Sequence, residues 1–67
     1  MEIEKRLAER VKRYRKERGW SQEELADRAG LHRTFISQIE RATKNTTIRS
    51  TEQVASALGV SFADLLD

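Results

Sequence analysis

Residues 20–41 read WSQEELADRAGLHRTFISQIER, and this stretch decides the fold. Its apolar residues recur every three to four positions, which indicates two short amphipathic helices. Ser21, followed three residues later by Glu24, is typical of a capping box at the start of a helix. Gly30 can supply the positive φ of a sharp turn. We therefore predict two short helices joined by a tight glycine turn.

The segment before this stretch predicts another helix, which Gly19 ends. One face of that helix carries four apolar residues at helical spacing: Ile3, Leu7, Val11 and Tyr14. Residues 42–46 hold no apolar side chain beyond Ala42 and predict a loop. The chain has no proline, linker, low-complexity segment or repeat, and its 67 residues suffice for one domain.

Two more helices are predicted after the loop. Thr47 is expected to cap a fourth helix that ends at Gly59 and turns these residues inward: Ile48, Val54, Ala55 and Leu58. Ser61 and Asp64 are expected to cap a last turn that carries three apolar residues: Phe62, Leu65 and Leu66. Helical spacing throughout predicts an all-α fold, a compact domain of five short helices spanning residues 1–67.

The net charge of +2 is a weak argument for any partner, but the charge is unevenly distributed. Residues 1–18 carry eight Lys or Arg against four Glu, a balance of +4. Residues 19–41 (three against four) and 42–67 (two against three) each balance to −1. A cationic N-terminal helix can steer a polyanion, but it can equally be a solvated helix face. Charge alone leaves both interpretations open.

Composition excludes several classes of function. The chain has no Cys, so disulfides and cysteine–metal sites are excluded. No apolar run approaches the roughly 20 residues that span a membrane, and no secretory signal pattern opens the chain, so we expect a soluble cytoplasmic protein. One His and scattered acidic residues predict no catalytic site, no metal site and no cofactor. We therefore expect a protein that is not an enzyme.

The polar side of the third predicted helix presents four residues: Arg33, Thr34, Ser37 and Gln38. Side chains of these types read base edges in duplex DNA. Arg makes bidentate contacts to guanine, Gln can pair with adenine, and Thr can offer its methyl to thymine. The competing interpretation is a solvated helix face without a ligand.

The stretch SQEELADRAGLHRTFISQIER, followed by VASALGVSFADLL, resembles the Cro and phage-repressor helix-turn-helix family over essentially the whole chain. Within that family, LHRTFISQIER followed by KNTTI is similar to the dimeric controller proteins of restriction–modification systems. A phage-type repressor and an antitoxin-associated regulator are the alternatives. The resemblance implies a lambda-repressor-like fold with a helix-turn-helix unit over about 21–41. It also implies a transcriptional regulator whose third helix docks in the major groove.

The resemblance also assigns supporting roles. Five residues are expected to contact DNA phosphates: Gln22, Lys44, Asn45, Thr47 and Arg41, of which Thr47 also competes as a helix cap and Arg41 is ambiguous with solvent. Residues at the positions of Arg15 and Glu40 form an ion pair in phage repressors, so this pair is expected to link the first helix to the third. Removing one partner would leave the other poorly compensated.

Four residues depart from the family pattern. His32 stands where a better N-cap is usual, and a His there could give the DNA affinity a pH dependence, although solvent exposure is the simpler interpretation. Ala42 replaces the customary glycine and Thr46 the frequent proline, so the shape of the loop is open. Thr51 occupies a usually apolar position, which would leave its hydroxyl partly buried.

The apolar C-terminus predicts a homodimer. It holds more apolar side chains than so short a last helix can hide: Val60, Phe62, Leu65 and Leu66. An isologous dimer would bind a palindromic operator whose half-sites lie about one helical turn apart. Alternatively, all four close the monomer core. Regulation is then expected from operator position and contact with RNA polymerase. A rival from another class is a helix-turn-helix scaffold that binds only protein.

Overall fold

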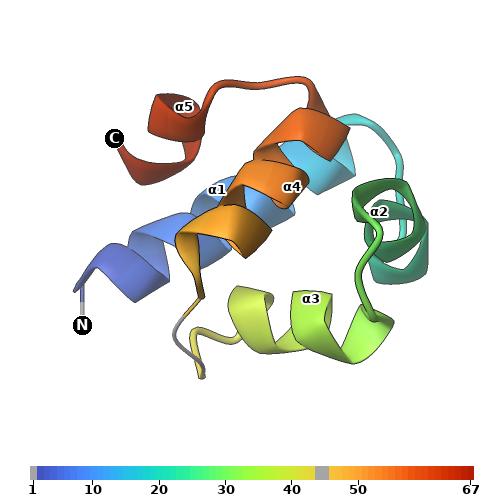
Figure 1. Ribbon diagram of the computed structural model, residues 1–67, viewed down its shortest axis with the longest axis horizontal. Coiled ribbons are helices and arrows are strands. Elements are labelled where there is room, and N and C mark those ends of the chain that lie inside the picture. The colour runs from blue at the N-terminus through green and yellow to red at the C-terminus, as the bar shows by residue number, and fades with distance from the viewer. Residues whose placement is uncertain (1, 44–45) are drawn as a thin grey trace.

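The computed structural model describes residues 2–43 and 46–67. This part of the chain forms five helices and no strand (Figure 1). In chain order they are α1 (Glu2–Glu17), α2 (Gln22–Ala29), α3 (Arg33–Glu40), α4 (Ile48–Leu58) and α5 (Phe62–Leu66). The predicted all-α fold of five short helices is confirmed. The pair α2 and α3 lies inside the stretch predicted to form the helix-turn-helix unit.

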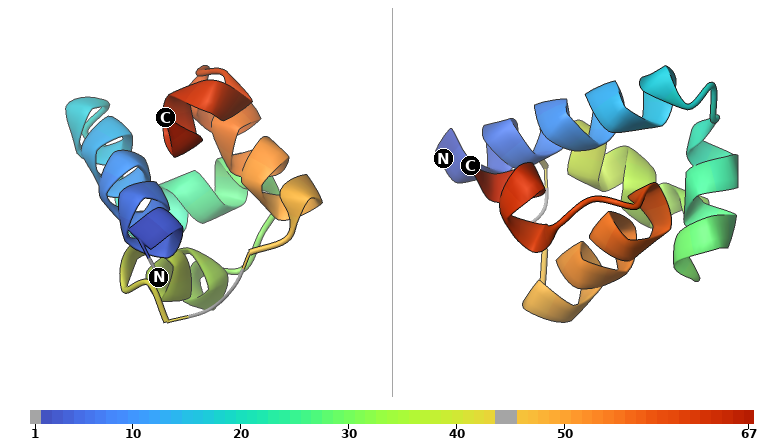
Figure 2. Two further views of the ribbon diagram at one scale, coloured as in Figure 1. Left: turned by 90° about the vertical axis from the view of Figure 1, so that its left-hand side faces the viewer. Right: turned by 90° about the horizontal axis from the view of Figure 1, so that it is seen from above.

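The helices pack around one core, and α3 contacts both α1 and α2. α1 packs against α3 and α5, and α2 packs against α3 and α4. In the left view of Figure 2, α1 stands on one side, α4 and α5 on the other, and α3 lies below them. The start of α1 and the end of α5 come together at the same end of the molecule. α3 is therefore held from the inside and open to solvent on its outer side.

Every helix contributes to the core. Six large side chains are fully buried: Val11, Leu25, Ile36, Val54, Leu58 and Leu65. Each fully buried side chain of this size is worth about 1.5–3 kcal/mol relative to exposure. Ile36 and Ile39 bury the inner side of α3, so the packing of the core fixes which side of α3 faces outward.

Three helices end at a glycine in the left-handed conformation, as predicted. Gly19, Gly30 and Gly59 have φ of +71°, +71° and +74°. In each case the next residue donates its N–H to a carbonyl five residues back, as with Leu31 N and Ala26 O at 2.9 Å. This is the Schellman motif, which satisfies the last carbonyls of a helix.

The C-terminus of α3 forms the same motif without a glycine. Thr43 N donates to Gln38 O (3.2 Å) and Ala42 N donates to Ile39 O (3.0 Å). Ala42 adopts φ +56°, the one positive φ at a non-glycine among the described residues. A left-handed alanine costs about 1–2 kcal/mol because its Cβ crowds the following carbonyl. The departure noted at this position is therefore a point of backbone strain.

The helix starts differ in their caps. Ser21 Oγ accepts from Glu24 N (3.0 Å), while the Glu24 carboxylate accepts from Arg28 Nε (2.7 Å), so the structure gives the Ser21 half of the predicted box. α5 has a complete capping box, and the hydrogen bonds from Ser61 lower the pKa of Asp64. α3 begins after His32, whose side chain makes no capping bond.

Ile48 does not face the core, contrary to the prediction. Its side chain is 78% exposed, because it stands at the first residue of α4, where the helix extends past the core. Thr51, one turn later, is buried instead. The Thr51 hydroxyl donates to Thr47 O (3.0 Å), so its burial leaves no unsatisfied polar group.

The prediction that Leu65 contacts a dimer partner is wrong. It is wholly buried in the protomer, where it closes the core, and so it cannot reach a partner. Phe62 remains 37% exposed, and Val60 and Leu66 are half-buried. These three keep part of their surface exposed, so a contact with a partner stays a prediction for them.

Candidate functional site

The outer side of α3 is polar and concave. We call Arg33, Thr34, Ser37, Gln38 and Arg41 the α3 outer face. Arg33, Thr34 and Arg41 are exposed, while Ser37 and Gln38 are half-buried. Four of them line a shallow hollow of about 260 Å³: Arg33, Thr34, Ser37 and Arg41. Residues 33, 37 and 41 are four apart, so they stack along one side of the helix.

Gln38 does not line this hollow. Its backbone carbonyl accepts from both Thr43 N (3.2 Å) and Thr43 Oγ1 (3.3 Å), which ties the start of the following loop to the end of α3. The structure therefore brings three of the four predicted base-reading residues together with Arg41. Gln38 lies beside them, further along the helix.

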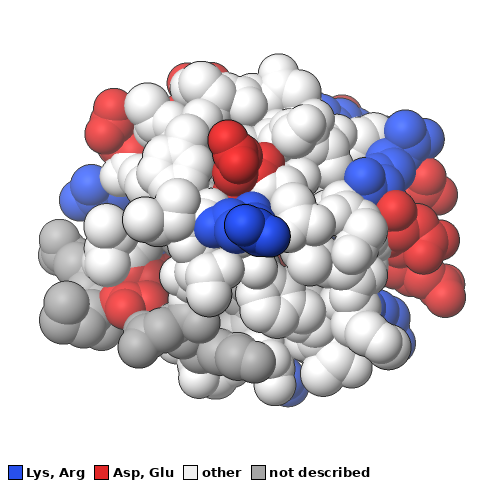
Figure 3. Space-filling model, in the orientation of Figure 1, with Lys and Arg blue, Asp and Glu red and all other residues white. Residues whose placement is uncertain are grey.

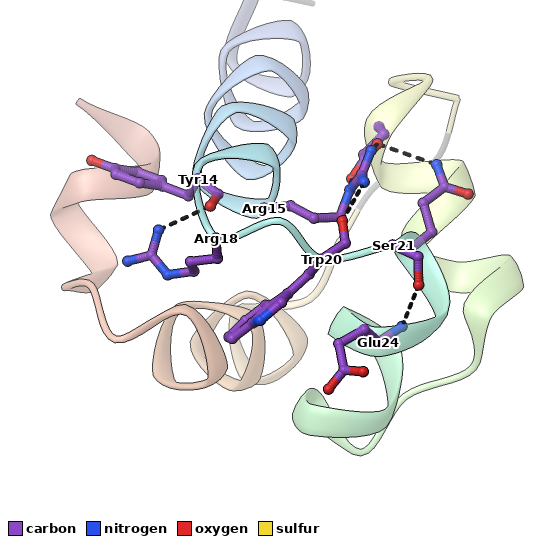
Figure 4. Close-up of polar contacts among 8 residues, drawn as sticks. Tyr14, Arg15, Arg18, Trp20, Ser21 and Glu24 are labelled. Carbon is purple, nitrogen blue, oxygen red and sulfur yellow. Dashed lines mark hydrogen bonds and ion pairs between the residues drawn. The ribbon is translucent and has the colours of Figure 1, made fainter.

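An ion pair joins α1 to the end of α3. Arg15 Nε donates to Glu40 Oε2 (2.6 Å) and Arg15 Nη2 donates to Glu40 Oε1 (2.9 Å), a bidentate arrangement. Arg15 Nη1 also donates to Trp20 O (2.8 Å), so all three guanidinium nitrogens are used (Figure 4). This is the pair that the resemblance implied.

The pair is shielded from water. The Arg15 side chain is 11% exposed and that of Glu40 is 2% exposed. The hydrogen bond to Glu40 raises the pKa of Arg15, against the opposing effect of burial. A buried pair adds little net stability but fixes geometry, since breaking it leaves a buried charge without compensation. It therefore fixes the position of α3 relative to α1.

Gln22 belongs to the same cluster, which sequence reasoning missed. Its Nε2 donates to Glu40 Oε1 (3.1 Å), so the first residue of α2 also bonds to the end of α3. No periodicity could reveal a contact between residues 18 apart in sequence. One amide hydrogen remains for another acceptor, so phosphate contact by Gln22 stays a prediction.

The remaining predicted phosphate contacts are less defined. Lys44 and Asn45 lie outside the described residues. Thr47 caps α4, since its Oγ1 accepts from Ser50 N (3.1 Å) and donates to Ser50 Oγ (3.0 Å). The cap role is confirmed, and the phosphate role of Thr47 stays a prediction.

A second surface is apolar and lies at the end of the molecule where α1 and α4 begin. We call it the apolar groove, a hollow of about 340 Å³ lined mainly by Ile3, Leu7, Ile48, Phe62 and Leu66. Ile3 (49%), Ile48 (78%) and Phe62 (37%) are the large exposed apolar side chains of the described chain. Sequence reasoning missed Ile3 and Ile48 because helical spacing assigns both to inner faces.

Among residues 2–43 and 46–67, no three His, Asp or Glu side chains come together as a metal site, and no helix is long and apolar enough to cross a membrane.

The fold and the exposed polar side of α3 define a helix-turn-helix protein. A helix-turn-helix family model matches residues 11–65, so this chain belongs to that family. A hypothetical transcription factor of Neisseria meningitidis serogroup B is 45% identical over 60 residues, 90% of this chain and 57% of that protein. The control protein C.SmaI of Serratia marcescens is 44% identical over 66 residues, 98% of this chain and 79% of that protein.

Solved structures agree with these relatives. The restriction-modification controller protein C.AhdI from Aeromonas hydrophila has a TM-score of 0.92 at 28% identity, covering 97% of this chain and 98% of that one. SinR, the master regulator for biofilm formation from Bacillus subtilis, in complex with DNA, has a TM-score of 0.86 at 44% identity. The match covers 91% of this chain and 98% of that one. The chain spans little more than half of some relatives, 57% of the Neisseria factor and 56% of SinR.

Proposed function

We propose that this protein is a cytoplasmic, sequence-specific regulator of transcription that binds double-stranded DNA. In this proposal it is a dimeric controller of restriction–modification gene expression on palindromic operators, acting through operator position and contact with RNA polymerase. The observation that carries the proposal is the α3 outer face, where an exposed arginine and hydroxyl groups surround one hollow opposite a buried apolar side. The similarity to C.AhdI and to SinR bound to DNA supports it.

The geometry suits insertion of α3 into the major groove. Arg33 is at the N-terminal end of α3, where recognition helices contact base edges. It is our candidate for a bidentate contact to guanine O6 and N7, with Thr34, Ser37 and Gln38 contacting neighbouring bases. The pair of Arg15 and Glu40 would keep this helix in one orientation during docking.

Phosphate contacts would surround the recognition helix and fix its register. We assign them to five residues: Gln22, Arg41, Lys44, Asn45 and Thr47. Gln22 stands at the N-terminus of α2, where the helix dipole favours an anion. Arg41 shares the hollow with Arg33 and carries its charge about two turns further along.

The apolar groove is our candidate for the dimer interface. In Figure 1 the starts of α1 and α4 and all of α5 lie toward the left, while α3 runs along the lower edge. A two-fold axis at that left end would place both α3 helices on the same lower side, as a palindrome requires. The interface would use Ile3, Ile48, Phe62 and Leu66, with Val60 at its margin.

The alternative of a protein-binding scaffold fits the surface less well. Protein interfaces place large apolar or aromatic anchors at their centre. The exposed large apolar side chains of the described residues lie in the apolar groove and none on the α3 outer face. A phage-type repressor or an antitoxin-associated regulator would share the DNA chemistry, and the genes beside the operator distinguish these from a controller.

Selection of bound duplexes from a random oligonucleotide pool tests the proposal. We expect a palindromic motif with half-sites about one helical turn apart. Arg33→Ala should cost about 1–3 kcal/mol on that motif and relax one position, whereas Lys44→Ala should weaken all sequences alike. Equal losses on random and selected DNA for Arg33→Ala would refute base reading, and no enriched motif would refute sequence-specific binding.

Sedimentation tests the dimer separately. Ile48→Lys changes a side chain that is 78% exposed, so the fold should survive. We expect the wild type to dimerise at tens of micromolar or on DNA and the variant to remain monomeric. Dimerisation of the variant with wild-type strength would exclude the apolar groove as the interface.

A further inference from the structure

The basic residues of α1 and of the turn after it fall into two groups, those held by the fold and those left at its surface. Arg6 donates to Leu66 O (3.1 Å), and Arg10 donates to Asp64 O (2.8 Å) and Asp67 O (2.7 Å), so both hold the end of α5. Arg15 is paired with Glu40, and Arg18 donates to Tyr14 O (2.9 Å). The fold uses these four arginines as internal connectors.

Four basic residues of α1 are left, of which Arg13 lies over the Tyr14 ring and the others are lysines: Lys5, Lys12 and Lys16. All three lysines are exposed, and within residues 2–43 and 46–67 no hydrogen bond or ion pair joins them to a neighbour. With 3.6 residues per turn they point within about 40° of one another and are spread over roughly 16 Å of helix. We call them the lysine stripe.

The lysine stripe lies on the side of α1 that is next to α3. Viewed down the axis of α1, Arg15 lies next to the buried Val11. The lysine stripe lies about 60–100° further round the helix in the same direction. Arg10, which holds α5, points the opposite way. The stripe is therefore further from the core than Arg15, on the outer side of the contact between α1 and α3.

The α3 outer face lies on the same side of that contact. Viewed down the axis of α3, Glu40 lies next to the buried Ile36. Arg33 and then Ser37 lie further round the helix in the same direction. Because Arg15 and Glu40 are bonded at 2.6 Å, the two surfaces adjoin across the ion pair. The left view of Figure 2 shows α1 and α3 as neighbours on one side of the molecule.

On the α4 side, which Figure 3 shows, the visible Lys and Arg side chains are scattered among Asp and Glu and do not gather in a patch. The stripe carries three positive charges against the one negative charge of Glu9 at its edge. A mainly positive surface beside a recognition face is placed to meet the sugar–phosphate backbone that borders the occupied groove.

We infer that the lysine stripe is a second, sequence-independent contact surface for duplex DNA, which binds phosphates flanking each half-site. This inference rests on the proposed function. Because its charges are flexible lysines with no fixed partner, the stripe would supply affinity and salt dependence but no base preference. It would lengthen the protected DNA beyond the bases that α3 contacts.

The test compares adjacent residues on different sides of one helix. Lys12→Gln removes a stripe charge, whereas Arg13→Gln removes an exposed charge that lies over the Tyr14 ring at 5.2 Å, outside the stripe. For each half-site that the protein occupies, we expect Lys12→Gln to lower the slope of log K against log salt by about 0.9, and Arg13→Gln to leave it nearly unchanged. The triple change Lys5→Gln, Lys12→Gln, Lys16→Gln should lower it by about 2–3 units per half-site.

The triple variant should bind both random and selected duplexes roughly tenfold more weakly at low salt, with the selected motif unchanged. Phosphate ethylation interference should lose its signals outside the half-sites. Equal slopes for Lys12→Gln and Arg13→Gln, or an unchanged slope in the triple variant, would overturn the inference while leaving the proposed function standing. If the wild type binds no duplex, the proposed function fails first, and the stripe with it.

Discussion

The two turns that bound α3 use the same backbone motif with different residues. Before α3, Gly30 closes a Schellman motif at φ +71°, and after it Ala42 closes another at φ +56°. Glycine adopts this conformation at no steric cost, whereas alanine is strained. The contacts around the C-terminal end of α3 are therefore strong enough to hold Ala42 in an unfavourable conformation.

Those contacts are made by residues on both sides of Ala42. Glu40 is bonded to Arg15 and Gln22, and Thr43 is bonded to Gln38 O through both its N–H and its hydroxyl. The N-terminal end has the opposite character, since its glycine turn is relaxed but His32 supplies no side-chain cap. The C-terminal end of α3 therefore combines satisfied hydrogen bonds with a strained residue. The N-terminal end combines a relaxed turn with a missing side-chain cap.

Breaking the contacts of the C-terminal end should have the largest effect. Glu40→Ala leaves the guanidinium of Arg15 buried without its partner, and we expect the free energy of unfolding to fall by about 3 kcal/mol. That is a large part of the stability of so small a domain. Urea unfolding followed by the fluorescence of Trp20, the single tryptophan, measures it.

Glu24→Ala is the matched control. Glu24 also accepts a hydrogen bond from an arginine, Arg28, but those side chains are 45% and 51% exposed. Its loss should cost no more than about 0.5 kcal/mol. Glu40→Gln keeps the shape and removes the charge, and should fall between the two. If Glu40→Ala cost as little as Glu24→Ala, the ion pair would not hold the end of α3.

Exchanging the residue types of the two turns should change the stability in opposite directions. Gly30→Ala should destabilise by about 1 kcal/mol, because a Cβ there has room, with Gln53 Nε2 at 3.8 Å, but the backbone conformation is strained. Ala42→Gly should stabilise by about 0.5–1 kcal/mol, since relief of strain exceeds the entropy that glycine loses on folding. Equal signs for the two changes in urea unfolding would contradict the strain at Ala42.

These two turns also show what sequence can predict. Gly19, Gly30 and Gly59 mark helix ends because glycine alone adopts positive φ freely, so the residue type reveals the conformation. Ala42 carries no such mark, and its conformation follows from bonds that Gln38 and Ile39 accept. Local chemistry gave the caps at Ser21, Thr47 and Ser61 for the same reason.

Burial was harder to predict where a helix leaves the core. Ile48 has the spacing of an inward residue, but periodicity does not say where the core ends, and it is exposed. The opposite error was made at Leu65, which was predicted to contact a dimer partner. α1 and α4 pack on α5 and bury Leu65 fully. At the candidate site, residue types indicated the α3 outer face, and the ion pair came from family resemblance. The bond between Gln22 and Glu40 needed the three-dimensional structure.

The smallest effect concerns the weak feature of the N-terminal end. His32→Ser offers a side-chain hydroxyl as a cap at the start of α3, where His32 makes no side-chain capping bond, and we expect about 0.5 kcal/mol of added stability in the same unfolding assay. The two ends of an eight-residue helix lie roughly 12 Å apart, so the gains of His32→Ser and Ala42→Gly should add. A combined gain well below the sum would show that the ends are coupled through the helix. In that case α3 would respond to both turns as one rigid element, and strain at Ala42 would already be shared with the start of the helix.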